Sequence, residues 1–242
     1  MKNKTINKIS SIFLALLIVL VVNSSAMASS IYQGGKVRNV PAFKELNLSI
    51  SADVYLTQGN TQKVEILASD KLLEKIETEV KGGALNIKWT ERNVRHSEKI
   101  KIYITMTDVN ALRIAGSGDI IASGLISTSD LELKISGSGN IKLPDVKANK
   151  ISSKISGSAD ISLKGSSTVE ELSVAISGSG DVDAGDLPAN DVAISISGSG
   201  DCKVHADGTL KARVAGSGDV YYKGKAVIDS KVSGSGSIKY VN

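Results

Sequence analysis

The amino-acid sequence predicts an all-β fold, a parallel β-helix or solenoid with coils of about 20 residues and an irregular N-terminal capping region. Three observations predict this fold. A glycine-rich motif returns at nearly constant spacing, apolar and polar residues alternate around each copy, and glycine, serine and β-branched residues dominate a composition poor in aromatics. A globular antiparallel sandwich is the alternative, but its turn spacings would vary more.

The repeated motif is Ser-Gly-Ser-Gly-Asp with small variations. Its first glycine stands at positions 116, 137, 157, 178, 198, 216 and 234, so the steps are 21, 20, 21, 20, 18 and 18 residues. One such repeat cannot bury its own apolar face, and stacking on neighbouring repeats solves this problem. The near-constant step therefore predicts stacked coils with a turn at each motif.

The alternation around each motif predicts the core. When the copies are aligned on the first glycine, apolar residues recur six, four and two positions before it and four and six positions after it. This period of two predicts two short strands per repeat, each with one buried face. The position two residues before the glycine is occupied in turn by Ile114, Ile135, Ile155, Ile176, Ile196, Val214 and Val232.

The N-terminal half is a longer version of the repeat. Residues 46–56 fit the template with Ile50 at the first-glycine position, yet Gly116 follows only 66 residues later. We interpret 37–242 as a single solenoid domain, with irregular coils and an insertion at 37–111 and regular coils at 112–242. The insertion is predicted to contain strands at 63–67, 76–80, 84–89 and 100–106, a helical turn at 70–76 and a tight turn at 81–83.

The first 28 residues are predicted to be a signal peptide. Three lysines precede an apolar run at 12–22, which is too short to span a bilayer, and Ala26-Met27-Ala28 fits a cleavage site. We expect a short linker at 29–36 and a secreted, periplasmic or cell-envelope protein with no integral membrane segment after cleavage. Because Cys202 is the only cysteine, neither a lipid anchor nor an internal disulfide is expected.

The charge balance argues against a nucleic-acid partner. The whole chain has 29 basic and 25 acidic residues, and three of the basic residues belong to the predicted signal peptide. The remaining 26 basic and 25 acidic residues nearly cancel. The basicity of the chain therefore belongs mainly to the export signal and not to a nucleic-acid-binding surface.

No pattern in the sequence predicts a catalytic, cofactor or metal site. Cys202 stands in an inward column of isoleucine and valine, which favours a small buried apolar residue. No spacing pairs His96 or His205 with Cys202 in a nucleophile or zinc arrangement. The glycine-rich turns are not followed by a helix, so they do not fit phosphate-binding loops.

An acidic column follows the turns and admits two interpretations. Each carboxylate could cap its own turn, or the stack could bind a cation that relieves repulsion of roughly 1 kcal/mol per pair in water. The sequence leaves both open. The column consists of Asp119, Asn140, Asp160, Asp181, Asp201, Asp219 and Ser237.

The chain resembles the head GIN domain family of auto-transporter adhesins. The resemblance extends from about Val37 to the end and rests on the repeated motif and on four stretches: Phe43–Leu46, Asp53–Gly59, Leu72–Ile76 and Gly83–Trp89. It implies an exported bacterial β-helix with an adhesive or surface role, and the family supplies no catalytic residues. We do not expect a C-terminal translocator domain, because only five residues follow Ser237.

These observations favour a non-catalytic, adhesin-like surface or binding module that presents a repetitive β face to a glycan, a surface or a protein. A structural envelope protein that self-associates is the alternative, and a polysaccharide-active β-helix enzyme fits less well because no long insertion follows Leu112. Tyr55 and Tyr221 are predicted to point outward without forming an aromatic stripe. A homo-oligomer is expected to form, if at all, through the C-terminal end near Tyr240.

Overall fold

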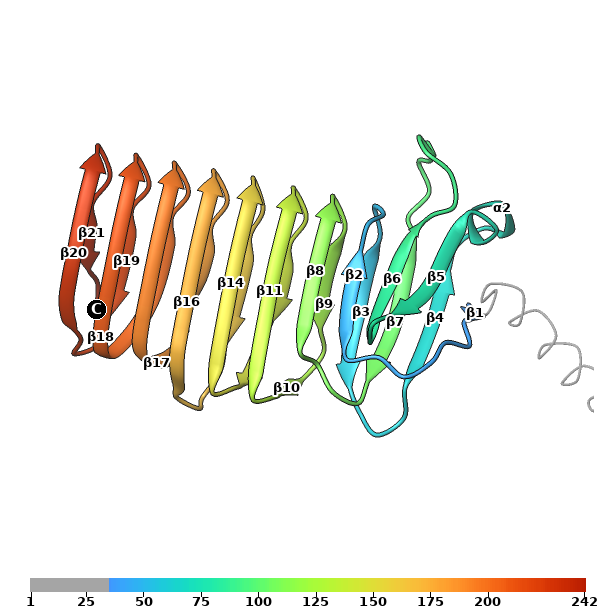
Figure 1. The fold of residues 1–242 in the computed structure, drawn as a ribbon, viewed down its shortest axis with the longest axis horizontal. Coiled ribbons are helices and arrows are strands. Elements are labelled where there is room, and N and C mark those ends of the chain that lie inside the picture. The colour runs from blue at the N-terminus through green and yellow to red at the C-terminus, as the bar shows by residue number, and fades with distance from the viewer. Residues whose placement is uncertain (1–34) are drawn as a thin grey trace, which may run out of the picture. The chain divides into compact units, whose positions relative to one another are not determined.

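The computed structural model describes residues 35–242, so the predicted signal peptide and most of the predicted linker lie outside the described residues. The first strand, β1 (Lys36–Val37), begins one residue before the expected start of the domain. Successive coils stack along one axis as a parallel solenoid (Figure 1). No helix among residues 35–242 has the length and apolarity needed to cross a membrane.

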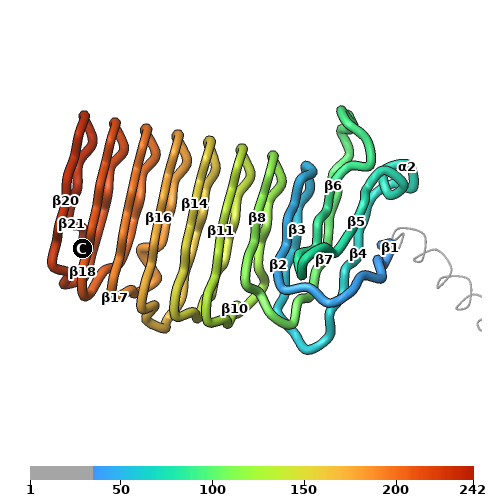
Figure 2. The backbone as a smooth tube through the Cα atoms, in the orientation of Figure 1, coloured from blue at the N-terminus to red at the C-terminus, as the bar shows by residue number. Residues whose placement is uncertain are grey.

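Two long faces make up the regular coils, and the turn motif joins them at one edge (Figure 2). The first face contains β8 (Ala111–Gly116), β11 (Asp130–Gly137), β14 (Lys150–Gly157), β16 (Val169–Gly178), the later parts of β17 (Val182–Gly198) and β18 (Cys202–Gly216), and β20 (Val227–Gly234). The second face contains β9 (Asp119–Ala122), β12 (Ile141–Leu143), β15 (Ile161–Lys164), the first residues of β17 and β18, β19 (Val220–Lys223) and β21 (Ile238–Tyr240).

Neighbouring coils pair in parallel and in the register that the motif predicts. Gly116 lies opposite Gly137, Gly178 opposite Gly198, and Gly216 opposite Gly234. This alignment confirms the predicted solenoid and excludes the antiparallel sandwich. It also stacks the inward side chains into columns, whose residues are buried in every regular coil before β19.

The irregular N-terminal coil follows the same template. In β2 (Glu45–Leu48), Leu48 pairs with Ile114 of β8, and in β3 (Asp53–Gln58), Val54 pairs with Ile120 of β9. Ile50 therefore takes the place of the first glycine in this turn, as predicted. The next pair, β6 (Ala84–Trp89) and β7 (Lys101–Met106), lies on the other side of β2 and β3. After β2 and β3 the chain thus continues away from the regular coils to form the strands up to β7, and it then returns to the other side of β2 to form β8.

Antiparallel strands end the stack on the N-terminal side. β4 (Lys63–Leu67) runs against β7, and β1 runs against β4. β5 (Ile76–Lys81) forms the predicted hairpin with β6 through Gly82 and Gly83, whose φ angles of 61° and 79° suit a two-residue turn. The helical turn predicted at 70–76 is shorter than expected: α2 (Asp70–Leu73) ends three residues before the predicted end.

A third, narrow side closes each coil opposite the turn edge. It contains the two-stranded parallel sheet of β10 (Leu125–Ser127) and β13 (Asp145–Lys147) and the bends within β17 and β18. Ile126, Val146, Leu187 and Ala206 point inward here and are buried. The sequence pattern gave no signal for this additional core column, since the corner lengths differ between coils.

Candidate binding surfaces

The turn edge is held by backbone hydrogen bonds between coils. In each regular turn after the first, the serine N–H donates to the first-glycine carbonyl of the preceding coil, for example Ser179 N to Gly157 O at 2.9 Å. The first glycines have φ angles of 130–137°, and a Cβ added at Gly178 would lie 2.2 Å from the Gly157 oxygen. Glycine is therefore required both by the backbone conformation and by the close approach of the stacked turns.

The acidic column forms a hydrogen-bond ladder along this edge. The column carboxylates and the Asn140 amide oxygen accept the N–H of the column residue in the next coil, as Asp181 does from Asp201 N and Asp201 from Asp219 N, both at 2.7 Å. The carboxylates thus cap the neighbouring coil rather than their own turns, contrary to the simpler turn interpretation. This gives the column a structural role that needs no cation, and residues 35–242 contain no cluster of three metal-ligating side chains.

Asp219 anchors the last coil most strongly. Its Oδ1 accepts from both the N–H and the hydroxyl of Ser237 at 2.7 Å, and its Oδ2 lies 3.1 Å from Lys239 Nζ and Tyr221 Oη. These hydrogen bonds, chiefly the one from the Ser237 side chain, lower the pKa of Asp219 to about 2.

The cysteine and histidine side chains do not converge. Cys202 is buried in the inward column, as predicted, and burial raises the pKa of its thiol far above the usual range. His96 stacks edge-on against Trp89 at the cap, whereas His205 lies 3.4 Å from Asp207. The structure therefore brings together no Cys–His pair from the residues considered in the sequence.

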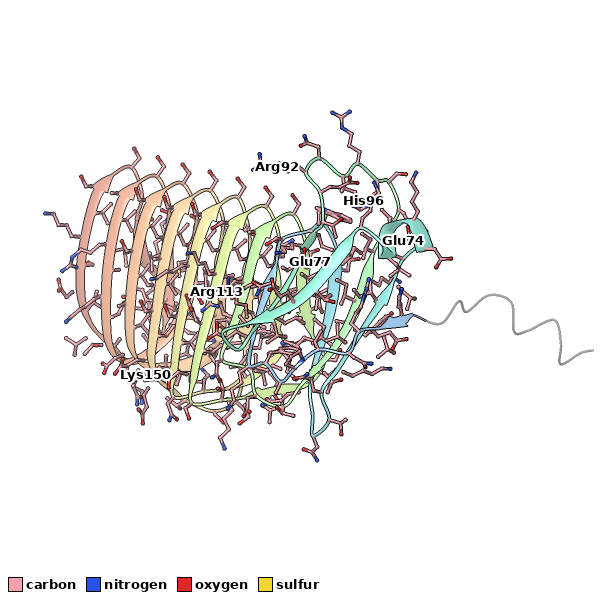
Figure 3. The ribbon with its side chains drawn as sticks, turned by 45° about the vertical axis from the view of Figure 1, so that its right-hand side comes forward. Glu74, Glu77, Arg92, His96, Arg113 and Lys150 are labelled. Atoms are coloured by element: carbon pink, nitrogen blue, oxygen red, sulfur yellow. The ribbon has the colours of Figure 1, made fainter. Side chains whose placement is uncertain are left out.

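The first face is flat, and its side chains repeat from coil to coil. Its basic column, formed by Arg113, Lys134, Lys154, Arg213 and Lys231, is interrupted at Ala175 and Ser195. An open hollow of about 340 Å³ lies at this interruption, between the two lysines and the small residues. Figure 3 shows Arg113 and Lys150 on this side of the solenoid and His96 at the cap.

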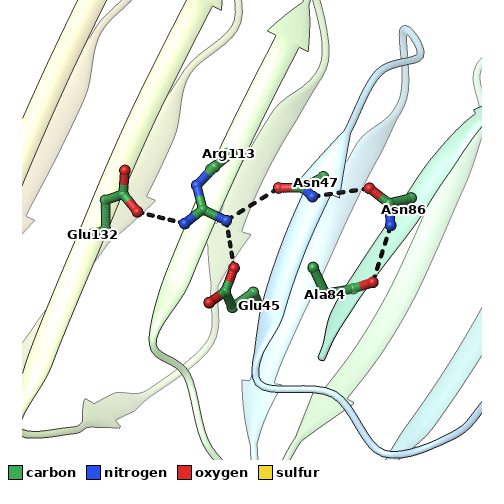
Figure 4. A network of polar contacts seen from close by, with 6 residues as sticks. All are labelled: Glu45, Asn47, Ala84, Asn86, Arg113 and Glu132. Atoms are coloured by element: carbon green, nitrogen blue, oxygen red, sulfur yellow. Dashed lines mark hydrogen bonds and ion pairs between the residues drawn. The ribbon is translucent and has the colours of Figure 1, made fainter. Parts of the chain in front are cut away.

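A polar network fixes the junction between the irregular and regular coils. Arg113 on β8 bonds to Glu45 Oε2 of β2 at 2.5 Å and to Glu132 of β11 (Figure 4). Asn47 continues the network to Asn86 of β6 at 2.9 Å. Because one guanidinium bridges two carboxylates on adjacent coils, the network sets the register where the regular stack begins.

A polar groove lies at the edge where the first face meets the narrow third side. Its volume is about 840 Å³, and it is lined by residues of β11, β14 and β16 on successive coils, by β10 and β13, and by the loops beside them, including the loop that precedes β8. An ion pair of 2.9 Å joins Lys150 to Glu171 across it. Sequence reasoning missed this groove, because it is formed at the non-repeating corners. The lining combines charged side chains, the apolar residues Leu131 and Ile151, and hydroxyl and amide groups that include Asn110, Ser127, Thr128, Asn149, Ser152 and Ser173.

The outward tyrosines of the second face lie at two separate places. Tyr55 of β3 stacks on Tyr103 of β7 with ring centroids 5.2 Å apart, and both lie on the second face. Tyr221 lies at the other end of the solenoid, where Lys239 sits 5.5 Å from its ring centre. The sequence predicted outward tyrosines that form no continuous aromatic stripe, and Tyr55 and Tyr221 indeed lie far apart along the solenoid.

The terminal coil exposes residues that belong to the core columns. Ile228 and Val232 are 41% and 38% exposed, whereas Leu210 and Val214 at the same positions of the preceding coil are almost fully buried. Tyr240 is 58% exposed, and Tyr222 before it is partly buried. Within residues 35–242, β20 pairs only with β18, and β21 only with β19. One edge of each of these two strands is therefore unpaired.

Most of this solenoid is similar to a known protein family. Residues 42–226 match the family described as "Putative auto-transporter adhesin, head GIN domain". None of the curated proteins matches the chain.

Three crystal structures of bacterial proteins show the same architecture. A structure described as a putative adhesin from Bacteroides fragilis is 27% identical with a TM-score of 0.81, and the match covers 85% of this chain and 95% of that chain. A second such adhesin, from Parabacteroides distasonis, is 25% identical with a TM-score of 0.68, over 86% and 96% of the two chains.

The third structure, described as a putative lipid binding protein from Parabacteroides distasonis, is 26% identical with a TM-score of 0.71, again over 86% and 96% of the two chains. The family and these neighbours support an exported, adhesin-like surface module. On the family match over residues 42–226, the chain belongs to the auto-transporter adhesin head GIN domain family.

Proposed function

We propose that this chain is a non-catalytic binding module that holds an extended glycan or protein partner along its first face, with the polar groove as the principal contact. The observation that supports this most is the run of hydroxyl, amide and charged groups across the groove on successive coils. Each coil adds one row of such groups about 4.8 Å further along the axis, which is the spacing between paired strands, although the side chains differ between coils, as in Asp130, Lys150 and Glu171.

A repeating surface of this kind suits many weak contacts better than one deep site. The groove is open, and its lining offers hydrogen-bond donors and acceptors beside the apolar residues Leu131 and Ile151. An extended partner can form equivalent contacts with several coils, so its affinity would grow with the length in contact. Sugar hydroxyls and peptide amides both match such a lining.

The test compares two tyrosine substitutions on the same coil. Ser152→Tyr places a ring in the groove from β14, whereas Ser162→Tyr places the same ring outward on the second face from β15. Binding of the mature protein to an array of bacterial and host polysaccharides should fall at least about tenfold, or 1.4 kcal/mol, only for Ser152→Tyr. Equal losses for both variants would remove the groove from the proposal.

Catalysis is tested separately on the same polysaccharides. Retained glycans are incubated with the wild-type protein, and new reducing ends are measured over time. We expect no increase above buffer. Steady release of reducing ends that depends on protein concentration would overturn the non-catalytic part of the proposal.

A further inference from the structure

We propose that the terminal coil is a self-association surface, and that two copies of this chain join tail to tail by antiparallel pairing of β20 with β20 of the second copy. This inference goes beyond the proposed function and does not depend on what the first face binds. It starts from the exposed edge of the last coil. Unpaired edges with apolar side chains are the usual route by which β proteins associate.

The exposed side chains continue a core that is otherwise closed. Ile196 and Val214, in the column that ends with Val232, are 1% and 2% exposed, and Leu210, which precedes Ile228 in its column, is 0% exposed. In the terminal coil Val232 and Ile228 are 38% and 41% exposed, and Val227 beside them is 76% exposed. A further coil laid on this surface would bury them as every earlier coil buries its neighbour.

The β20 sequence is complementary to itself in one antiparallel register. A twofold axis at Ser230 places Ile228 opposite Val232 of the second copy, and Asp229 opposite Lys231. The inward apolar residues then extend both cores, while the outward charges form cross-strand ion pairs. An axis at Asp229 or at Lys231 would instead place like charges opposite each other, and an odd shift would turn inward residues outward.

The symmetry of this pairing limits the assembly to two copies. A twofold contact uses the same patch on both chains, so the joined ends leave no further free edge of this kind. The dimer would be a solenoid of double length with first faces on both halves. A partner spanning both halves would then gain multivalent affinity.

A charge swap tests the register directly. Light scattering of the mature protein from about 1 to 50 µM should show a dimer whose dissociation constant lies in or below that range. Asp229→Lys and Lys231→Asp should each shift the protein to a monomer, because each places like charges opposite each other. The double variant Asp229→Lys/Lys231→Asp restores opposite charges and should restore the dimer.

A cysteine variant tests the same axis by a second route. In the proposed register the two copies of residue 230 face each other across the twofold axis, at a distance that a disulfide can bridge. Ser230→Cys should give a covalent dimer under mild oxidation, whereas the exposed control Ser177→Cys on the lateral face should not. Cys202 is buried and does not compete.

Several outcomes would overturn the proposal. These are a wild-type monomer at 50 µM, a double variant that remains monomeric with an unchanged circular dichroism spectrum, or equal cross-linking of the two cysteine variants. A monomer that floats with phosphatidylethanolamine–phosphatidylglycerol vesicles would assign the exposed coil to a lipid surface instead. None of these results depends on glycan binding, so failure here is distinguishable from failure of the proposed function.

Discussion

Stacked glycine turns should make the regular coils unusually sensitive to a single methyl group. In Gly178→Ala, the added Cβ would lie 2.2 Å from the carbonyl oxygen of Gly157, and φ at this position is +130°. The backbone conformation alone costs an alanine roughly 1–3 kcal/mol. Relieving the contact must displace the oxygen that accepts from Ser179 N–H, and overpacking of this kind costs roughly a further 1–3 kcal/mol.

Gly116 offers a matched control in the first regular turn. Its φ of +136° is nearly the same, but no atom lies within 4 Å of the position that a Cβ would occupy. Gly116→Ala therefore has the destabilising backbone conformation but no close contact between coils. Gly178→Ala should be less stable than Gly116→Ala by about 2 kcal/mol, or roughly 4–8 °C in Tm for a domain of this size.

The assay is thermal unfolding followed by circular dichroism, with urea unfolding as a second measure of stability. Wild type, Gly116→Ala and Gly178→Ala are compared at one protein concentration, because self-association would also raise Tm. Equal melting temperatures for the two variants would refute the argument that close stacking of the turns, rather than backbone strain alone, selects glycine.

Three further results are expected. Ser153→Val should raise Tm by roughly 2–4 °C, because the Ser153 hydroxyl is buried with no hydrogen-bond partner in the described part of the chain; a lower Tm would contradict this. Cys202→Val should leave Tm and binding nearly unchanged, since valine already fills the adjoining positions of the column, and loss of binding by a folded variant would give the thiol a function. The folded-state pKa of Asp219 lies below its unfolded value near 4, so its stabilisation is complete above about pH 4 and is lost as the pH falls through about 2. Hydrogen exchange of the Ser237 amide should therefore accelerate over this pH range before exchange of the β12 amides does. If both accelerate at the same pH, Asp219 does not anchor the last coil locally.

The sequence was sufficient for those parts of the fold that repeat. The alternation around each turn identified the buried columns, and it placed Leu48 and Val54 in register with Ile114 and Ile120 despite the missing glycine at position 50. Such positions are predictable because inward side chains must be apolar in every coil, whatever occupies the outer surface. The hairpin was predictable because two adjacent glycines permit the tight turn.

Features that depend on contacts between coils were harder to predict. The position of β6 and β7 outside β2 and β3 leaves no mark on local alternation, since either order buries the same residues. The Asp ladder was visible as a column, but its bonds run to the next coil rather than within the turn. The polar groove lies at corners of different length, so no periodic signal marks its residues.

The two ends of the solenoid explain why association should stop at a dimer. A parallel coil stack could in principle grow without limit, because each coil presents the same edge to the next. Here the N-terminal end presents a different edge: β4 runs against β7, β1 pairs over only two residues, and β5, which pairs with β6 alone among the described strands, is antiparallel to the stack. A second copy approaching this end would meet a cap, whereas at the other end it meets the eight residues of β20 with their core side chains exposed. The cap therefore acts against filament formation, and the self-complementary strand directs the remaining edge into a closed pair.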